Sequence, residues 1–324
     1  MSAARTREVR LAPVDQVVEV EGRQLKISNL DKVLYPASGT TKGEVLAYVT
    51  AVSEVLLPHL RDRALTRKRW PDGVEGNTFF EKNVPRGTPS WIRTVTLPVP
   101  GSTKQRETIT YPLIEDLPGL VWVTNLAALE LHVPQWRVGP RGGVHHPDRL
   151  VVDLDPGPPA ALPECVEVAL AVRERLAADG LDCYPVTSGG KGLQLYAPVA
   201  GTQDADVIRG YARRLAEDLE REMPKLVVSR MTKVLRKSKV LLDWSQNNAV
   251  KTTICPYSPR GRERPTVAAP RTWDELEEAA GTPSGLRQLE FDDVAGRVGE
   301  LGDVVADLLP EPGSKISRPK VPAS

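Results

Sequence analysis

The sequence predicts an α+β fold in which mixed or antiparallel sheets are flanked by helices. Capped amphipathic segments alternate with short apolar runs that have the length of strands. Several of these runs are joined by Gly- or Pro-containing turns, which gives more hairpins than a doubly wound parallel sheet contains. The 324 residues, 40% of them hydrophobic, suffice for a large core. We therefore expect one domain of two packed subdomains over residues 1–310 and a disordered tail over 311–324.

The first half of the chain is expected to contain hairpins and two helices. Thr41 and Glu44 form a capping box, which predicts that a helix begins there and runs to about residue 59. The other expectations, in chain order, are a frayed start over 1–12, a hairpin over 17–30, a strand and turn over 68–81, two strands around Pro100-Gly101 over 94–114, a helix over 120–131 and a Gly- and Pro-rich loop over 139–147.

The second half alternates strands with amphipathic helices. Gly180 is expected to end a helix, because glycine adopts the backbone conformation that terminates helices. The elements expected here are strands over 149–155, 182–187, 193–197 and 239–244, helices over 163–179, 204–222, 273–280 and 292–308, and a Pro- and Arg-rich loop over 256–271.

Two carboxylates one residue apart end the apolar run over 149–155. Alternate side chains of a strand share a face, so Asp153 and Asp155 should point the same way. Like charges this close repel unless a cation lies between them, and hard divalent cations take clustered carboxylate oxygens. Asp243, in a second strand, offers a third carboxylate. The alternative is that Asp155-Pro-Gly simply forms a turn after the strand, and the pattern alone leaves both open.

The turn Ser188-Gly-Gly-Lys191-Gly192 has the composition of a phosphate-binding loop. Glycines let backbone N–H groups approach an anion, Lys191 adds a positive charge and Ser188 adds a donor. The turn lacks the spacing of a Walker A motif, so a flexible hairpin turn remains an alternative. Arg236 and Arg260 could bind phosphate oxygens, although an arginine taken singly is more often a solvated surface charge.

Aromatic and basic residues suggest a nucleic-acid surface. Phe79 and Phe80 follow the basic stretch Thr66–Trp70, and an exposed ring there would provide a platform for base stacking. Burial in the core is the default for both rings, and likewise for His132, which lies on an apolar stretch. The formal net charge is only +1, so a basic groove would have to be local.

Composition also limits the type of protein. The three cysteines show no metal-ligand spacing and are expected to be reduced thiols, and none of the apolar runs reaches membrane-spanning length. We therefore expect an intracellular protein that uses no membrane, which in a bacterium means the cytoplasm.

Read together, these motifs resemble the polymerase domain of bacterial ligase D, within the archaeo-eukaryotic primase superfamily. The resemblance covers about residues 25 to 300 and suggests a stand-alone homologue, with an RRM-like catalytic module. The segments that carry it are Asp31–Pro36, Arg67–Pro71, Phe79–Lys82, Leu131–Trp136, Val152–Pro156, Thr187–Leu193, Asp243–Gln246 and Pro265–Trp273.

The resemblance implies a role for each candidate residue. It implies templated nucleotidyl transfer to a primer 3′ end at gaps or breaks, with a preference for ribonucleotides over deoxyribonucleotides. The implied sets are Asp153, Asp155 and Asp243 for two Mg²⁺ or Mn²⁺ ions; His132, Ser188, Lys191, Arg236, Gln246 and Arg260 for the NTP or dNTP; Phe79, Phe80 and Arg69 for the template; and Lys32 and Lys42 for a downstream 5′-phosphate.

Two departures from the family pattern bear on that activity. The family commonly has histidine where this chain has Gln194, and serine where it has Gly190. Glutamine keeps a donor but carries no charge. A non-catalytic DNA-end or gap-binding module is therefore an alternative, and a metal-dependent nuclease is a weaker one. DNA is the expected partner of a monomer near the nucleoid, and the sequence leaves open whether Ku, a DNA ligase or a base-excision pathway works with it.

Overall fold

A six-stranded sheet forms one half of the molecule. The computed structural model describes residues 16–99, 107–282, 285–309 and 318–322. The strand order is β13 (Val227–Val228), β14 (Val240–Leu242), β10 (Arg149–Pro156), β12 (Leu193–Pro198), β11 (Tyr184–Thr187) and β16 (Ala269–Pro270). Every neighbouring pair is antiparallel except β13 and β14, which are parallel. The predicted mixed sheet is therefore present.

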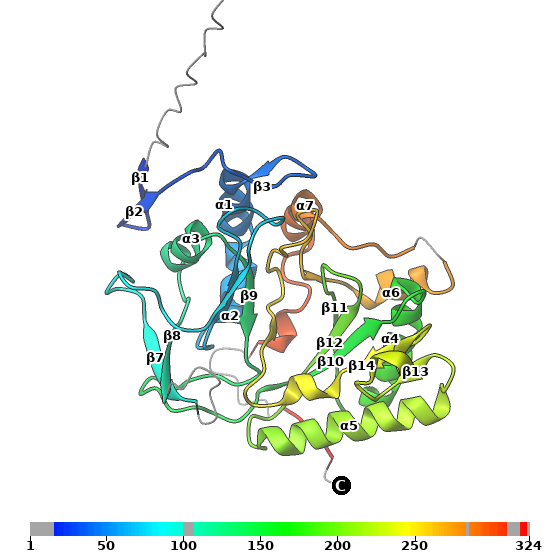
Figure 1. Cartoon of the computed structure of the whole chain (residues 1–324). Coiled ribbons are helices and arrows are strands. Elements are labelled where there is room, and N and C mark those ends of the chain that lie inside the picture. Colours follow the sequence, from blue (N-terminus) through cyan, green and yellow to red (C-terminus); the bar gives the residue numbers. More distant parts are fainter. Residues whose placement is uncertain (1–15, 100–106, 283–284, 310–317, 323–324) are drawn as a thin grey trace, which may run out of the picture.

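A four-stranded antiparallel sheet forms the other half (Figure 1). Its order is β15 (Thr253–Ile254), β9 (Ala128–Val133), β5 (Thr66–Arg69) and β6 (Phe79–Glu81). The helices in this half are α1 (Lys42–Ala51), α2 (Ser53–Leu60) and α3 (Leu117–Asn125). Three two-stranded ribbons complete it: β1 (Gln16–Val20) with β2 (Arg23–Ile27), β3 (Val33–Tyr35) with β4 (Thr40–Thr41), and β7 (Thr94–Pro98) with β8 (Thr108–Pro112).

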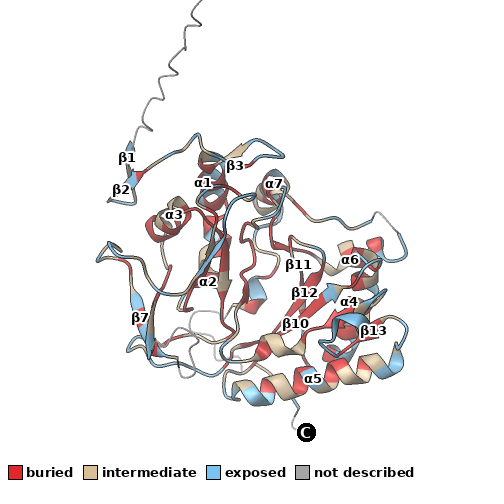
Figure 2. Cartoon of the chain, viewed as in Figure 1, coloured by how far each residue is buried: buried red, intermediate tan, exposed pale blue. Residues whose placement is uncertain are grey.

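The alternation of β10 divides its side chains between two cores. Leu150, Val152 and Leu154 pack in one buried cluster with the amphipathic helices α4 (Leu162–Ala178) and α5 (Ala205–Glu222). Val151, on the opposite face, packs with side chains of β9 in a second cluster that draws on both sheets. Figure 2 shows this burial concentrated in β10 and β12, with an exposed outer side on α5. Asp153 and Asp155 share the face of Val151, so the pleat directs them toward the four-stranded sheet.

The remaining elements follow β12 and complete the C-terminal part. They are the helices α6 (Trp273–Ala279) and α7 (Phe291–Leu301) and the 3₁₀ turns η1 (Lys233–Arg236), η2 (Trp244–Asn247) and η3 (Ala306–Leu308). Among the described residues, none of the helices is long and apolar enough to cross a membrane. The predicted turn at Pro100-Gly101 and the predicted frayed start lie outside the described residues.

The helix predicted over 120–131 is wrong in its second half. Helix α3 ends at Asn125, and Ala127 has a positive φ of 58°, which breaks the helical path. Residues Ala128–Val133 instead form β9, which pairs with β5. The apolar run fits the period of a helix and that of a strand. Pairing with β5 decides for the strand, in which Glu130 and His132 share one face.

Three other boundaries also differ from prediction. The helix expected from Thr41 to residue 59 is two helices that meet at Val52, although its capping box is present. The helix expected over 292–308 ends at Leu301, where Gly302 has a φ of 67°. The strand expected over 239–244 is shorter, because Asp243 caps η2.

The disordered tail predicted over 311–324 is wrong for residues 318–322. Val321 is 2% exposed and packs in the α4–α5 core, and its backbone N–H donates to Gln203. Ala200 donates its N–H to the carbonyl of Pro319 at 2.9 Å. Composition alone indicated disorder, but one apolar side chain and these paired backbone groups fix the segment on the fold.

Candidate active site

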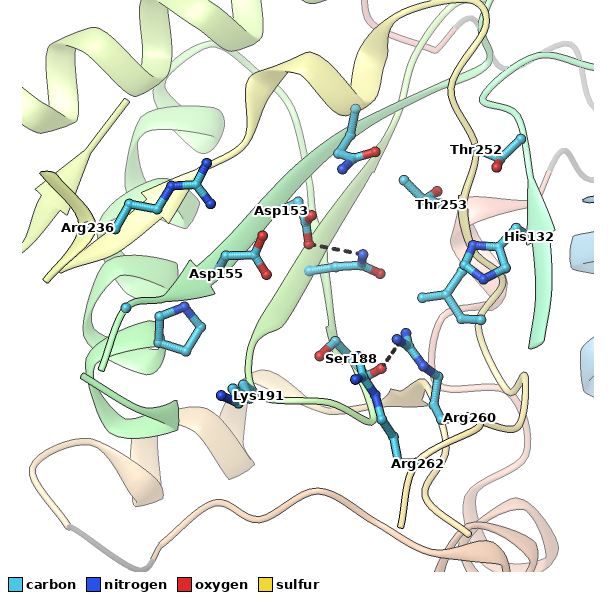
Figure 3. A pocket seen from close by; sticks show the side chains of 15 residues that line it. His132, Asp153, Asp155, Ser188, Lys191, Arg236, Thr252, Thr253, Arg260 and Arg262 are labelled. Atoms are coloured by element: carbon cyan, nitrogen blue, oxygen red, sulfur yellow. Dashed lines mark hydrogen bonds between the residues drawn. The ribbon is translucent and has the colours of Figure 1, made fainter. Parts of the chain in front are cut away.

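A cavity of about 400 Å³ is lined by residues of both sheets. All six residues predicted to bind nucleotide line it, together with two of the three predicted aspartates. They are His132, Ser188, Lys191, Arg236, Gln246 and Arg260, with Asp153 and Asp155. Figure 3 shows the two carboxylates in the middle of the cavity, with cationic side chains around them. Acidic and basic groups thus face the same space.

Strand register places the three aspartates on one face. In the pairing of β10 with β14, Leu154 is opposite Leu242, and the N–H of Asp243 donates to the carbonyl of Asp153 at 2.8 Å. Residues opposite each other across a ladder point to the same side, so Asp243 follows β14 on the face of Asp153 and Asp155.

Asp153 lies in a strongly unfavourable setting for a charge. Its side chain is buried, and burial, followed by the charges of Asp155 and Asp243, raises its pKa to about 8. Burial and the charge of Asp243 likewise raise the pKa of Asp155. Carboxylates placed together at this depth favour protonation or a bound cation. The oxygen donors suit a hard divalent ion.

Asp243 differs from the other two because its oxygens are already occupied. It accepts hydrogen bonds from the N–H and hydroxyl of Ser245 and from the side-chain amide of Gln246, and Lys251 lies 3.9 Å away. It is not among the residues that line the cavity. Within the described part of the chain, no three His, Cys, Asp or Glu side chains are arranged to hold a metal ion. The side chains as placed therefore present two cavity-facing carboxylates rather than the predicted cage of three.

Gln194, the departure from the family pattern, contacts an aspartate. It is opposite Asp153 in the β10–β12 register, and its amide nitrogen donates to Asp153 Oδ1 at 3.0 Å. The dashed line at Asp153 in Figure 3 marks this bond. The Tyr196 hydroxyl lies 2.8 Å from Gln194 Oε1 and 2.9 Å from the carbonyl of Ile254. The amide of Gln194 thus turns its NH₂ group toward Asp153 and its oxygen toward the Tyr196 hydroxyl.

The Gly-rich turn is held in shape by its own hydrogen bonds. Ser188 Oγ accepts from the N–H groups of Gly190 and Gly192, and the N–H of Gly189 donates to Gln288. A Cβ on Gly192 would lie 2.0 Å from the carbonyl of Leu154, so only glycine allows the turn to pack against β10. Several turn amides are thus engaged inside the protein, while Lys191 and Ser188 still face the cavity.

A buried glutamate connects the cavity residues of the two sheets. Glu130 Oε2 lies 2.8 Å from His132 Nε2, and its Oε1 lies 3.2 Å from Arg260 Nε. Arg260 in turn donates to the carbonyl of Ser188 at 2.8 Å. Burial lowers the pKa of His132 despite the neighbouring Glu130, so the imidazole is neutral at pH 7.

The predicted DNA-binding residues fall into two groups. The default of core burial is wrong for Phe79 and Phe80, whose exposed fractions are 47% and 53%. The Phe80 ring centroid lies 5.9 Å from that of His132, which places Phe80 beside the cavity. Arg69 supports β6 through its ion pair with Glu81 at 2.9 Å.

The two lysines predicted to bind a 5′-phosphate are engaged within the protein. Lys32 forms an ion pair with Asp72 at 2.9 Å, and the side chain of Lys42 is buried and donates to the carbonyl of Ser28. Neither lysine lines the cavity. The structure therefore does not join them to the nucleotide-facing residues.

Several cavity residues were not predicted as site residues. Arg262, Thr252 and Thr253 line the cavity, and Glu130 lies behind it. Arg262 stands two residues after Arg260 in a loop, so its proximity to the turn at Ser188 follows from tertiary packing and not from a motif. Glu130 could have been predicted only from the alternation that places it on the same face of a strand as His132. Predicting a helix for this segment excluded that inference.

The fold is that of the primase-polymerase class. The family model "LigD, primase-polymerase domain" matches residues 41–305, so the chain belongs to the LigD primase-polymerase family. It is 48% identical over 88% of its length to the multifunctional non-homologous end joining protein LigD of Mycolicibacterium smegmatis, and 32% identical over 89% to the bifunctional LigD of Bacillus subtilis.

A solved structure is also similar over most of the chain. The polymerase domain from Mycobacterium tuberculosis ligase D in complex with DNA superposes with a TM-score of 0.82 at 47% identity, covering 88% of this chain and 99% of that one. The primase-polymerase fold that the sequence predicts is thus confirmed. The chain spans 36% of the length of the M. smegmatis relative and 45% of the B. subtilis one.

Proposed function

We propose that this chain adds nucleotides to primer 3′ ends on a DNA template, filling gaps or extending broken ends during repair. The observation that supports this most strongly is the cavity itself, where Asp153 and Asp155 face Lys191, Arg260 and other cations. The negative charge of a nucleoside triphosphate would neutralise these cationic side chains. Positioning and charge stabilisation provide most of the catalysis in phosphoryl transfer, and both are functions of such a cavity.

The carboxylate side of the cavity fits the two Mg²⁺ or Mn²⁺ ions that the family implies. Asp153 and Asp155 would hold them, with Asp243 adjacent and available after its bonds to η2 rearrange. Such ions activate a primer hydroxyl and neutralise charge on the departing pyrophosphate. The protein's own contribution is to hold Asp153 and Asp155 on one strand, where alternate side chains point to the same face.

The cationic side would bind the triphosphate. Lys191 extends from the Gly-rich turn, and Arg260, Arg262 and Arg236 border the same cavity. An arginine can bind phosphate oxygens with two parallel N–H groups, whereas Lys191 supplies a compact charge. Ser188 and Gln246 add neutral donors, and Gln246 also contacts Asp243 at 3.0 Å.

DNA would lie along the exposed aromatic strand. Phe80 projects from β6 beside His132 and can stack on a template base, since every base offers a π face, and Phe79 is exposed on the same strand. Lys32 and Lys42 would bind a downstream phosphate only after leaving their present partners. The M. tuberculosis neighbour was solved with DNA, and the LigD relatives act in end joining. We therefore extend DNA partnership and a bacterial end-joining setting to this chain, and we propose with them the ribonucleotide preference and the Ku and ligase partners that the family resemblance implies.

A non-catalytic DNA-end or gap-binding module is the second candidate. The observation that favours it is Asp243, whose oxygens are occupied by η2 and Lys251. If that arrangement persisted with metal present, two carboxylates would remain and catalysis would fail while DNA binding survived.

A primer-template assay with labelled nucleotides and Mn²⁺ distinguishes the candidates. Extension supports the polymerase, shortening indicates a nuclease, and an unchanged primer with retained DNA affinity indicates the binding module. The Asp155→Asn variant is the matched control, because it keeps the shape of the side chain and removes one cavity charge. Extension by this variant at the wild-type rate would show that the carboxylate of Asp155 takes no part in catalysis.

A further inference from the structure

Glu130 occupies an unusual place for a carboxylate. It lies in the middle of β9 and is only 2% exposed. Burying an ionised carboxylate is costly unless hydrogen bonds and opposite charges surround it. Glu130 has three such neighbours: His132 Nε2 at 2.8 Å, Arg260 Nε at 3.2 Å and the backbone N–H of Gly261 at 3.2 Å.

These neighbours keep Glu130 ionised, and this fixes the proton on the histidine. Burial alone would raise the pKa of Glu130, but the His132 hydrogen bond and the charge of Arg260 lower it to about 2. An ionised carboxylate can only accept, so Nε2 of His132 carries the hydrogen. In the neutral ring Nδ1 is then the acceptor, and His132 presents a defined tautomer to the cavity that it lines.

Glu130 also connects the two sheets through Arg260. The arginine pairs with Glu130 of the four-stranded sheet on one side and donates to the carbonyl of Ser188 on the other. Ser188 begins the turn between β11 and β12 of the six-stranded sheet. One buried carboxylate therefore determines the orientation of two cavity residues, one of them directly bonded to the Gly-rich turn.

We propose that Glu130 is a positioning residue of the nucleotide site, setting the His132 tautomer and the direction of Arg260 so that both meet the incoming nucleoside triphosphate. The proposal rests on the proposed function, because it takes the cavity to be the nucleotide site. Glu130 itself does not reach the cavity lining, so it acts through its two neighbours.

The test is the Glu130→Gln variant. The amide keeps the volume of the side chain, but it carries no charge to pair with Arg260, and its NH₂ group cannot accept a hydrogen bond from His132. Binding of a ribonucleoside triphosphate with Ca²⁺ should weaken roughly 10- to 100-fold, which is the scale of a lost charge-assisted hydrogen bond. In extension assays KM should rise more than kcat falls, and primer-template affinity without nucleotide should stay unchanged. Glu130→Asp, which keeps the charge, should recover part of the affinity.

Glu275→Gln is the matched control. Glu275 also holds two arginines, Arg271 at 2.8 Å and Arg297 at 2.7 Å, but it lies outside the cavity. It should lower thermal stability without changing the nucleotide Kd. A purely structural role for Glu130 would produce the same result as this control, and that result would overturn the proposal.

A double-mutant cycle keeps the test decisive if Glu130→Gln folds poorly. In an Arg260→Gln background, Glu130→Asp should reduce nucleotide affinity less than it does alone, because the part of its effect that passes through Arg260 is already lost and only the part through His132 remains. Full additivity would contradict the proposal. Failure of the wild-type protein to bind any nucleoside triphosphate would instead refute the proposed function, so the two failures are distinguishable.

Discussion

Two aspartates of the β10 segment have opposite electrostatic settings, Asp148 partly exposed just before the strand and Asp153 buried within it. Asp148, just before the strand, accepts hydrogen bonds from Arg63 at 2.7 and 2.8 Å and from Arg137 at 2.8 Å. Burial would raise its pKa, but the charges of Arg63, Arg137 and Arg149 lower it to about 2. Among the described residues, Asp153 receives one side-chain hydrogen bond, from Gln194, and its pKa is raised to about 8.

The difference separates structural charge from functional charge. The protein neutralises Asp148 with its own arginines, so this carboxylate is complete without a ligand. Asp153 is surrounded by like charges from Asp155 and Asp243, and nothing on its side of the cavity neutralises them fully. A strongly perturbed carboxyl group in a cavity is typical of a site that binds a cation or performs chemistry.

The largest expected effect comes from Asp153→Asn. Primer extension should fall on the order of 10⁴-fold, the scale seen when a group at the reacting atoms is removed. Because the change also removes a buried acid that repels Asp155 and Asp243 whenever it ionises, the free energy of unfolding without metal should not decrease. Extension kinetics and urea denaturation measure the two quantities. Loss of stability without loss of extension would show that Asp153 has the structural role that we assign to Asp148.

Asp148→Asn should show the reverse pattern. It leaves Arg63 buried without its carboxylate partner, and breaking a buried ion pair costs about 3–5 kcal/mol of stability. Extension by the folded fraction should stay close to wild type. Urea denaturation followed by tryptophan fluorescence measures the loss, and a change below about 1 kcal/mol would show that the Arg63 pair contributes no more than an exposed one.

The pH dependence of stability sharpens the same contrast. Between about pH 4 and 8, folded Asp153 keeps a proton that the unfolded chain has lost, so its contribution to stability falls as pH rises, by no more than about 1.4 kcal/mol per pH unit. Asp148 acts oppositely: its contribution is present above its ordinary pKa and is lost as pH falls toward 2.

Denaturation in EDTA across this range tests the prediction. Asp153→Asn should flatten the decline between pH 4 and 8, and Mn²⁺ should restore stability to the wild type at pH 8 but not to the variant. An unchanged pH profile in the variant would show that Asp153 does not titrate in this range.

The smallest expected effect comes from Gln194. Gln194→Leu removes the amide donor to Asp153 and should raise the Mn²⁺ concentration needed for half-maximal extension roughly 10-fold, as loss of a partner of a metal ligand does. Gln194→His restores the residue common in the family and should stay nearer to wild type. Metal titrations of both variants test this prediction. If the wild type and both variants needed the same Mn²⁺ concentration, the contact between Gln194 and Asp153 would play no part in metal binding.

The sequence predicted the parts of the site that depend on local pattern. Asp153 and Asp155 needed only the alternation of a strand, and the Gly-rich turn needed only its composition. The packing of Arg262 beside that turn and the occupied state of Asp243 depend on contacts between distant segments, which no local pattern encodes. Residues 128–131 were predicted as helix because their apolar run fits both periods until β5 pairs with it.

The most direct test of the central claim is a crystal structure with Mn²⁺ and a non-hydrolysable nucleoside triphosphate, read by anomalous scattering. We expect manganese bonded to the carboxylates of Asp153 and Asp155, with the triphosphate directed toward Lys191 and Arg260. A cavity that holds no manganese, with both carboxylates still facing each other, would contradict the account.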